Sequence, residues 1–248
     1  AFRVPRPAGE VQALFFGLGA DGTVGSTKSS VKIIGEHTDL WSQGYFVFDS
    51  KKSGSATVSH LRFGPEPIGA TYLIEDADFV ACHQFGLLEQ MRVLDHARPG
   101  ATLLLNSPYP ADEVWGHLPR SIQEQLVAKG IDLWVIDAYR VAREEGMGTR
   151  INTVMQPCFF QLAGVLPAEE AIHHIKVAIE ATYGKRGRTL VDQNNAAVDR
   201  SLAELSRVEV PAEVGPDSAP PPAVTIGADA PDFVRQVTAR LLAGEGDL

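Results

Sequence analysis

The sequence predicts an α/β protein, specifically a three-layer α/β/α domain with a mainly parallel sheet. Short apolar runs alternate with segments of helical character through the first half of the chain, which is typical of layered α/β folds. Several of these runs end in Asp or Asn, as buried parallel strands often do where they reach a sheet edge. A Gly-rich turn, GLGADG, follows the first run and precedes a predicted helix, so a strand–loop–helix phosphate site is expected there.

The predicted strands comprise residues 11–16, 43–50, 55–64, 78–83, 101–106 and 133–138. Polar and apolar residues alternate in the segment 55–64, so we expect that strand to be the more exposed one. Predicted helices comprise residues 23–35, 87–97 and 118–129, with another starting near Tyr139 and a largely helical region over 151–207. Pro99-Gly100 predicts a turn before the strand at 101–106.

Three regions of different composition are expected along the chain. Residues 1–10 read as a linker and residues 11–210 as one domain. Residues 211–248 read as a Pro-rich connector that carries a short terminal helix at about 231–243.

The bulk composition excludes several classes of function. A net charge of −9 over 248 residues gives no general basic surface for nucleic acid or an anionic membrane. No apolar stretch is long enough to span a bilayer and no signal peptide opens the chain, which predicts a cytoplasmic protein. The two cysteines, Cys82 and Cys158, lie in apolar contexts and predict buried structural thiols. The histidines have no metal-ligand spacing, and we predict neither a metal site nor a catalytic nucleophile.

The turn at residues 17–25 is the first candidate site. Its glycines would let the backbone approach a phosphate, and the first helical turn would direct N–H groups at it. Hydroxyl groups and one cation could add further contacts. The candidate residues are Gly17, Gly19, Gly22, Thr23, Gly25, Ser26 and Lys28. The alternative is a tight turn whose glycines serve packing alone.

A second candidate site is the turn that follows the strand at 43–50. Asp49 could hold ribose hydroxyls, but Ser50, Lys51 and Lys52 suit an additional ribose phosphate better. Two phosphate sites on neighbouring strand ends fit either NADP or coenzyme A. The alternative is a solvated turn.

Polar residues elsewhere are weaker candidates for ligand contacts. Arg150 and Asn152 place a cation and an amide beside a Gly-Met-Gly turn, where they either contact a ligand or another domain, or fix the turn. Asn106 and Asp137 each end a predicted strand, where they either face a ligand or cap a helix.

Several consecutive stretches resemble the gamma region of the pyruvate:ferredoxin (flavodoxin) oxidoreductase family. They are GLGADGTVGSTKSSVKIIGE, QGYFVFDSKKSGSATVSHLRFGPEPI, DADFVACH and GTRINTVMQPCFF, in family order, and the resemblance runs from about Phe16 to Arg207. In the single-chain enzymes this region is the third domain and is implicated in coenzyme A binding. The resemblance implies a part of an enzyme that converts pyruvate to acetyl-coenzyme A, with ferredoxin or flavodoxin as electron acceptor and with other domains or subunits as partners.

Two departures from the whole family enzyme limit what this chain could do alone. It has no CxxCxxC run for a [4Fe–4S] cluster, and it has no GDG motif followed by NN for thiamine diphosphate and Mg²⁺. The resemblance therefore places those cofactors on other parts of the parent enzyme, and the isolated chain is expected to be inactive.

Three functions are compatible with these features. The leading one is a coenzyme A-binding gamma domain. The alternatives are an NADP-dependent dehydrogenase domain, which lacks any evident hydride-transfer residues, and a structural scaffold that binds nothing.

Overall fold

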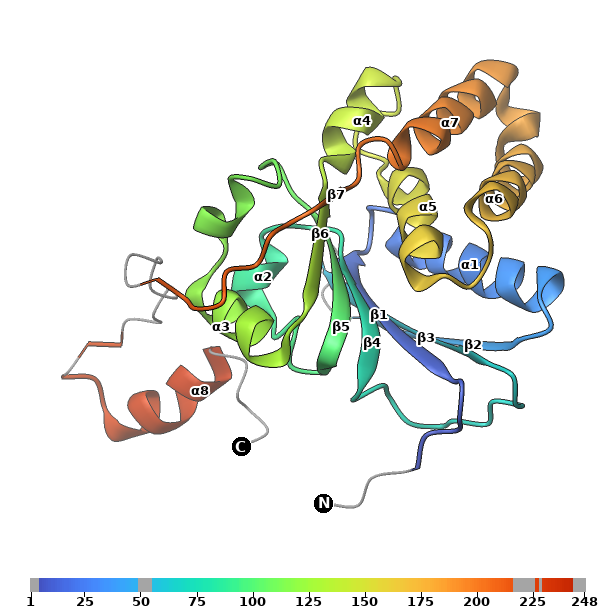
Figure 1. Cartoon of the computed structure of the whole chain (residues 1–248). Helices are drawn as coiled ribbons and strands as arrows, with labels where there is room; N and C mark the ends of the chain where they lie inside the picture. Colours follow the sequence, from blue (N-terminus) through green and yellow to red (C-terminus); the bar gives the residue numbers. More distant parts are fainter. Residues whose placement is uncertain (1–4, 49–54, 216–225, 228, 243–248) are drawn as a thin grey trace.

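The computed structural model describes residues 5–48, 55–215, 226–227 and 229–242 (Figure 1). Within these ranges seven strands form one sheet in the order β2-β3-β1-β4-β5-β6-β7. They are β1 (Val11–Leu18), β2 (Trp41–Phe48), β3 (Ala56–Gly64), β4 (Ala77–Cys82), β5 (Ala97–Asn106), β6 (Asp132–Ile136) and β7 (Ser206–Arg207).

Strands β1, β4, β5 and β6 are parallel neighbours at the centre of the sheet. β3 runs antiparallel to β1 and to β2, and β7 runs antiparallel to β6. β2 therefore points the same way as the four central strands, and only β3 and β7 are reversed. The predicted mainly parallel sheet is confirmed, with one antiparallel strand near each end, β3 on one side and β7 on the other.

Helices cover both faces of this sheet (Figure 1). On one face lie α1 (Thr23–His37) and α5 (Asn152–Ala163), and α6 (Ala168–Tyr183) and α7 (Arg188–Ser201) pack against them. On the other face lie α2 (Leu87–Gln90) and α3 (Arg120–Lys129), while α4 (Ala138–Glu144) follows β6. This arrangement confirms the predicted three layers.

The core consists of two hydrophobic clusters, one on each face of the sheet. Because side chains alternate along a strand, adjacent residues of β1 enter different clusters. Phe15 lies in the cluster that contains Phe79 and Phe159 of α5, whereas Leu14 lies with Val80 in the cluster that contains residues of α3. Burial on both faces explains why β1 and β4 read as continuous apolar runs rather than alternating ones.

The prediction that residues 55–64 form a more exposed strand is wrong. β3 lies between β1 and β2, and it is buried from Ser59 to Gly64. Two of its polar side chains have hydrogen-bond partners inside the fold: the His60 ring accepts from Ile74 N–H, and Arg62 donates to the carbonyl of Tyr72. The hydroxyls of Thr57 and Ser59 are buried without a hydrogen-bond partner among the described residues. The alternation of polar and apolar residues in this segment therefore does not indicate exposure, because the position of the strand between two others buries it.

The predicted helix at 87–97 is also wrong in length, because α2 spans only Leu87–Gln90. The chain must return to the start of β5, where Ala97 pairs with Ala77, and this leaves room for a single helical turn. The Pro99-Gly100 turn lies within β5 as a local irregularity, since the pairing register with β4 shifts there and Gly100 has a φ of +76°. The helical region from 151 ends at β7.

The remaining described segments lie outside these layers. They are the short helical turns Val114–His117 and Gly184–Arg186 and, near the end of the chain, Val234–Thr238 followed by α8 (Ala239–Leu242). The predicted terminal helix is thus partly described. Within the described ranges no helix is both long and apolar enough to cross a bilayer.

Candidate functional site

The Gly-rich turn connects β1 to α1 at the carboxyl edge of the parallel strands, where ligands bind in open α/β sheets. Gly22 is the residue before α1 and has a φ of +87°, a conformation that favours glycine. A Cβ atom on Gly22 would lie 2.7 Å from the side chain of Asn152, and one on Gly17 would lie 2.1 Å from Thr23 Oγ1. These two glycines are therefore required by close packing.

The turn already contains an anion, the carboxylate of Asp21. It accepts hydrogen bonds from Leu18 N–H at 2.7 Å and from Thr23 N–H at 2.9 Å. The Thr23 hydroxyl donates to it at 2.6 Å, and the Gln84 amide at 3.0 Å. Asp21 is buried, so four donors hold this charge inside the loop.

Asp21 restricts where a ligand phosphate could sit. The N–H groups of Val24 and Gly25 make no hydrogen bond to another described residue, as expected in the first turn of a helix. Gly25 is exposed, and apart from its chain neighbours and the adjoining backbone of α1 no atom of the described residues lies within 4 Å of the position that its Cβ would occupy. An anion would therefore meet these two donors on the outer side of the helix start, beyond the Asp21 carboxylate.

The predicted hydroxyl donors are used within the protein. Thr23 is fully buried, and Ser26 is buried with its hydroxyl donating to the carbonyl of Thr23 at 2.9 Å. Lys28 is exposed one turn further along α1, with its ammonium group 5.2 Å from the centre of the Phe46 ring. Among these three residues, Lys28 presents its polar group to solvent.

His83 connects the loop to the end of β4. Its Nδ1 lies 2.7 Å from Thr23 Oγ1. Because the Thr23 hydroxyl gives its one hydrogen to Asp21, the Nδ1 of His83 carries the hydrogen that Thr23 accepts. Burial lowers the pKa of His83 to about 4, although the Asp21 charge acts in the opposite direction, so the ring is neutral at pH 7.

The structure places Asn106 and Asp137 in structural roles. Asn106 donates to the carbonyl of His83 and accepts from Ala138 N–H, both at 2.9 Å. Asp137 caps α4 by accepting from Arg140 N–H at 2.9 Å. Asn106 thus joins the end of β5 to the residues that follow β4 and β6, whereas Asp137 holds the start of the helix that follows β6.

Asn152 and Arg150 lie on the connection into α5. Asn152 packs directly against Gly22, so the structure brings this predicted residue to the Gly-rich turn. Arg150 is exposed, in a turn where Gly146 and Gly148 have φ values of +75° and +65°.

The second candidate turn, with Ser50, Lys51 and Lys52, lies outside the described residues. Ser55, which follows it, accepts a hydrogen bond from Gly19 N–H at 3.0 Å. The described residue that follows this turn is therefore anchored to the Gly-rich loop.

Sequence reasoning missed three further residues of this network: Asp21, Gln84 and Tyr139. The Tyr139 hydroxyl donates to Gln84 at 2.7 Å, and Gln84 in turn donates to Asp21. An acidic residue just before a helix is a recognisable capping signal, which could have identified Asp21. Gln84 and Tyr139 are brought together only by the pairing of strands far apart in the sequence.

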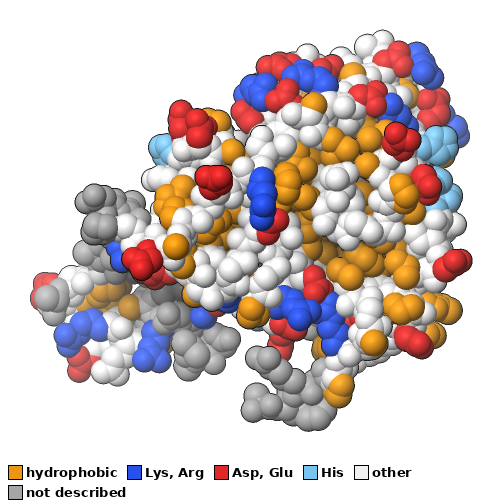
Figure 2. Space-filling view, in the orientation of Figure 1, with side chains coloured by type: hydrophobic (Ala, Val, Ile, Leu, Met, Phe, Trp, Pro, Cys, Tyr) orange, Lys and Arg blue, Asp and Glu red, His pale blue; other side chains and the backbone are white. Residues whose placement is uncertain are grey.

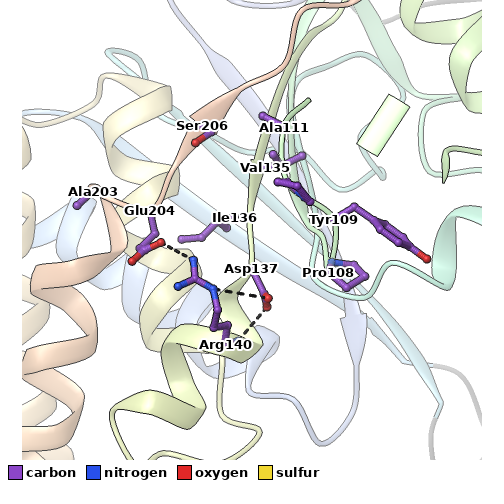
Figure 3. Close-up of a pocket in the computed structure, with 11 residues that line it drawn as sticks. Pro108, Tyr109, Ala111, Val135, Ile136, Asp137, Arg140, Ala203, Glu204 and Ser206 are labelled. Carbon is purple, nitrogen blue, oxygen red and sulfur yellow. Dashed lines mark hydrogen bonds and ion pairs between the residues drawn. The ribbon is translucent and has the colours of Figure 1, made fainter. Parts of the chain in front are cut away.

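A cavity of about 230 Å³ opens beside this network, at the ends of β5 and β6 (Figure 3). Arg140 lies in its wall, where it pairs with Glu204 at 2.5 Å and with Asp137 at 3.9 Å. These carboxylates neutralise the Arg140 charge, so this cavity is not an anion site. A second cavity of about 730 Å³ lies where residues 207–212 pass the start of β6. The Gly-rich turn lines neither cavity.

The cysteines cannot hold an iron–sulfur cluster of the family type. Cys82 and Cys158 belong to the clusters on opposite faces of the sheet, and burial raises the pKa of each thiol to about 12. A [4Fe–4S] cluster takes four cysteine thiolates, and the chain has two cysteines. In the part of the chain that the structure describes, no group of three or more His, Cys, Asp or Glu residues could hold a metal ion.

The fold and the turn define a three-layer α/β domain with a Gly-rich strand–loop–helix at the carboxyl edge of its parallel strands. The family model described as pyruvate ferredoxin/flavodoxin oxidoreductase matches residues 12–204. The chain belongs to this family, which confirms the resemblance seen in the sequence.

Relatives of the chain include pyruvate-flavodoxin oxidoreductase from Rhodospirillum rubrum, which is 54% identical over 236 residues. A putative pyruvate-flavodoxin oxidoreductase from Synechocystis is 55% identical over 237 residues, and pyruvate:ferredoxin oxidoreductase from Moorella thermoacetica is 45% identical over 241. The matches cover 95–97% of this chain and 20% of each relative. The chain thus spans about a fifth of the length of these proteins.

Two solved structures share the fold at 18% sequence identity. Pyruvate oxidoreductase subunit PORC from Thermotoga maritima has a TM-score of 0.63, with 81% of this chain and 99% of that chain covered. The 2-oxoglutarate:ferredoxin oxidoreductase from Magnetococcus marinus has a TM-score of 0.61, with 79% of this chain and 31% of that chain covered. The fold therefore occurs both as a whole chain and as part of a longer one.

Proposed function

We propose that this chain is the coenzyme A-binding domain of a pyruvate:ferredoxin or pyruvate:flavodoxin oxidoreductase. It would hold the thiol substrate that receives the acetyl group, while other parts of the enzyme carry thiamine diphosphate, Mg²⁺ and iron–sulfur clusters. The observation that carries the proposal is the first turn of α1 in a member of this family: Gly25 is exposed, and the N–H groups of Val24 and Gly25 donate to no other described residue. The structural relative from Magnetococcus marinus is described with 2-oxoglutarate, coenzyme A and succinyl-CoA bound.

The proposed contacts follow from which groups are available. The coenzyme A diphosphate would accept from Val24 N–H and Gly25 N–H, with Lys28 one turn away. Asn152, packed on Gly22, would hold the turn in shape, and Arg150 is an exposed cation near the same connection. Lys51 and Lys52 would bind the ribose 3′-phosphate, an assignment that rests on the sequence and on the Ser55–Gly19 hydrogen bond.

Substitution of Gly25 tests the diphosphate position. Because Gly25 is exposed with open space around its Cβ position, Gly25→Glu places a carboxylate beside the two donors without a clash. We expect Gly25→Glu to weaken coenzyme A binding at least tenfold relative to Gly25→Gln, which is about 1.4 kcal/mol. The neutral variant is the matched control for shape and helix propensity. Equal affinities of the two variants, measured by calorimetry, would move the diphosphate away from α1.

The lysine turn is tested with a ligand that lacks the group in question. Lys51→Ala combined with Lys52→Ala should weaken coenzyme A by at least tenfold, because charge-assisted contacts contribute roughly 1.5–3 kcal/mol each. The same double change should barely affect 3′-dephospho-coenzyme A. Equal losses for both ligands would show that these lysines do not hold the 3′-phosphate.

A further inference from the structure

The edge strand β2 carries large hydrophobic side chains on its surface. The side chain of Trp41 is 55% exposed and that of Tyr45 is 57% exposed. Nearby in the fold, Tyr72 is 44% and Leu73 is 45% exposed. Hydrophobic side chains are visible at the lower right margin of Figure 2, where β2 lies in Figure 1. We refer to Trp41, Tyr45, Tyr72 and Leu73 as the β2 surface.

These four residues belong to one face of the sheet. Trp41, Gln43 and Tyr45 alternate along β2 and point to the same side. The segment that carries Tyr72 and Leu73 packs on that side, because the Gln43 amide donates to the carbonyl of Ala70 at 2.9 Å. Helices α2 and α3 lie on the same side of the sheet but pack over β4, β5 and β6. The β2 surface is therefore left uncovered within the described residues.

Buried polar contacts hold this surface in place. Arg62 lies 4.9 Å from the centre of the Tyr72 ring and donates to the Tyr72 carbonyl at 2.9 Å. Arg62 is itself buried and pairs with Glu10 at 4.0 Å. The His60 ring accepts from Ile74 N–H at 3.1 Å and lies edge-on to Tyr45. The surface is therefore preorganised rather than a loose loop.

We propose that the β2 surface is a permanent contact between this domain and the remainder of the longer polypeptide to which it belongs. Grouped aromatic side chains on an open edge strand favour strand pairing and aggregation when they stay exposed to water. Permanent interfaces are more hydrophobic than transient ones, so the composition of this surface suits a constant neighbour. The relatives are about five times as long as this chain, so a large part of the same polypeptide exists to cover it. The proposal does not depend on coenzyme A binding.

The test uses the full-length polypeptide with the photo-crosslinking residue p-benzoylphenylalanine in place of Tyr45. After irradiation, mass spectrometry should find the β2 peptide joined to a peptide from outside these 248 residues. The matched control carries the same residue in place of Val177. Val177 is also exposed, at 53%, but it lies on α6 and does not belong to the β2 surface. The control should give at most a few per cent of the crosslinked yield.

A second measurement needs no substitution. Hydroxyl-radical footprinting of the wild-type full-length protein should oxidise Trp41 and Tyr45 at least tenfold more slowly than their exposure in this domain predicts. Crosslinks to the β2 surface of a second copy, or to an unrelated protein, would overturn the proposal. Rapid oxidation without any crosslink would overturn it as well.

Discussion

At the scale of single residues, Asp21 decides how the Gly-rich turn works. The pattern G-x-G-x-x-G predicts backbone donors around a ligand phosphate, yet the protein places its own carboxylate on part of that donor set. Thr23 was expected to contact the ligand, but its hydroxyl joins Asp21 to His83 instead. The spacing of the glycines in the sequence identified the turn. Which of its N–H and O–H groups bind Asp21, and which are left for a ligand, depends on three-dimensional contacts.

The first prediction concerns the stability supplied by Asp21. Asp21→Asn replaces one carboxylate oxygen by an NH₂ group that must face N–H or O–H donors. We expect the free energy of unfolding to fall by about 2–3 kcal/mol, since charged hydrogen bonds are lost inside the protein. Urea denaturation measures this change. Asp39→Asn, at an exposed position, is the control and should change stability by less than about 0.5 kcal/mol. Similar effects for the two substitutions would contradict the role given to Asp21.

The second prediction concerns His83 and pH. Its pKa is about 4 in the folded protein because of burial, against about 6.5 when unfolded. Between these values the unfolded chain binds a proton that the folded one does not. Stability due to His83 is therefore present above pH 6.5 and is lost as the pH falls toward 4, at up to about 1.4 kcal/mol per pH unit.

Unfolding free energies at pH 7, 6 and 5 measure this slope. His60 contributes in the same direction, because burial, then Arg62 and His96, lower its pKa to about 4. His83→Gln should make the slope shallower than in the wild-type chain. An unchanged slope in the variant would show that His83 is not the buried neutral group described here.

At the scale of elements, α1 illustrates what the sequence can predict. The apolar run, the Gly-rich turn and the start of α1 at Thr23 were all predicted correctly, because each has a local signal. The strand at 55–64 was also predicted, but its predicted exposure was wrong, and so was the predicted length of the helix at 87–97, because both depend on distant partners. β3 is buried by its place between two other strands, and α2 is cut short by the pairing of Ala97 with Ala77.

The third prediction compares two glycines at the start of α1. Gly22→Ala should reduce the unfolding free energy by about 2 kcal/mol or more, because φ is +87° and the new methyl group would meet Asn152. Gly25→Ala lies within the helix and meets no atom, so it should increase stability by roughly 0.5–1 kcal/mol. Thermal or urea denaturation distinguishes the two. Equal effects of both substitutions would contradict the described backbone of the turn.

At the scale of the whole molecule, the sequence identified the family and the layered fold through long matching stretches and local periodicity. The helix cap at Asp137 was one of the two roles weighed from the sequence, because capping is a local signal. The sequence could not show that Asn106 connects the ends of β4 and β6, since that role requires neighbouring strands. From the sequence, the segment that contains the aromatic residues of β2 was predicted only as a strand, with no indication that these side chains are exposed. Their exposure follows from the place of β2 at the edge of the sheet.

The central claim, that this domain binds coenzyme A, is tested most directly by isothermal titration calorimetry of the chain with coenzyme A and with NADP. Both ligands carry a diphosphate and a further ribose phosphate, so general attraction of phosphate would give heat with both. We expect saturable heat with coenzyme A and none with NADP. Heat with NADP alone would contradict it in favour of a dehydrogenase domain, and no heat with either ligand would contradict it in favour of a structural scaffold.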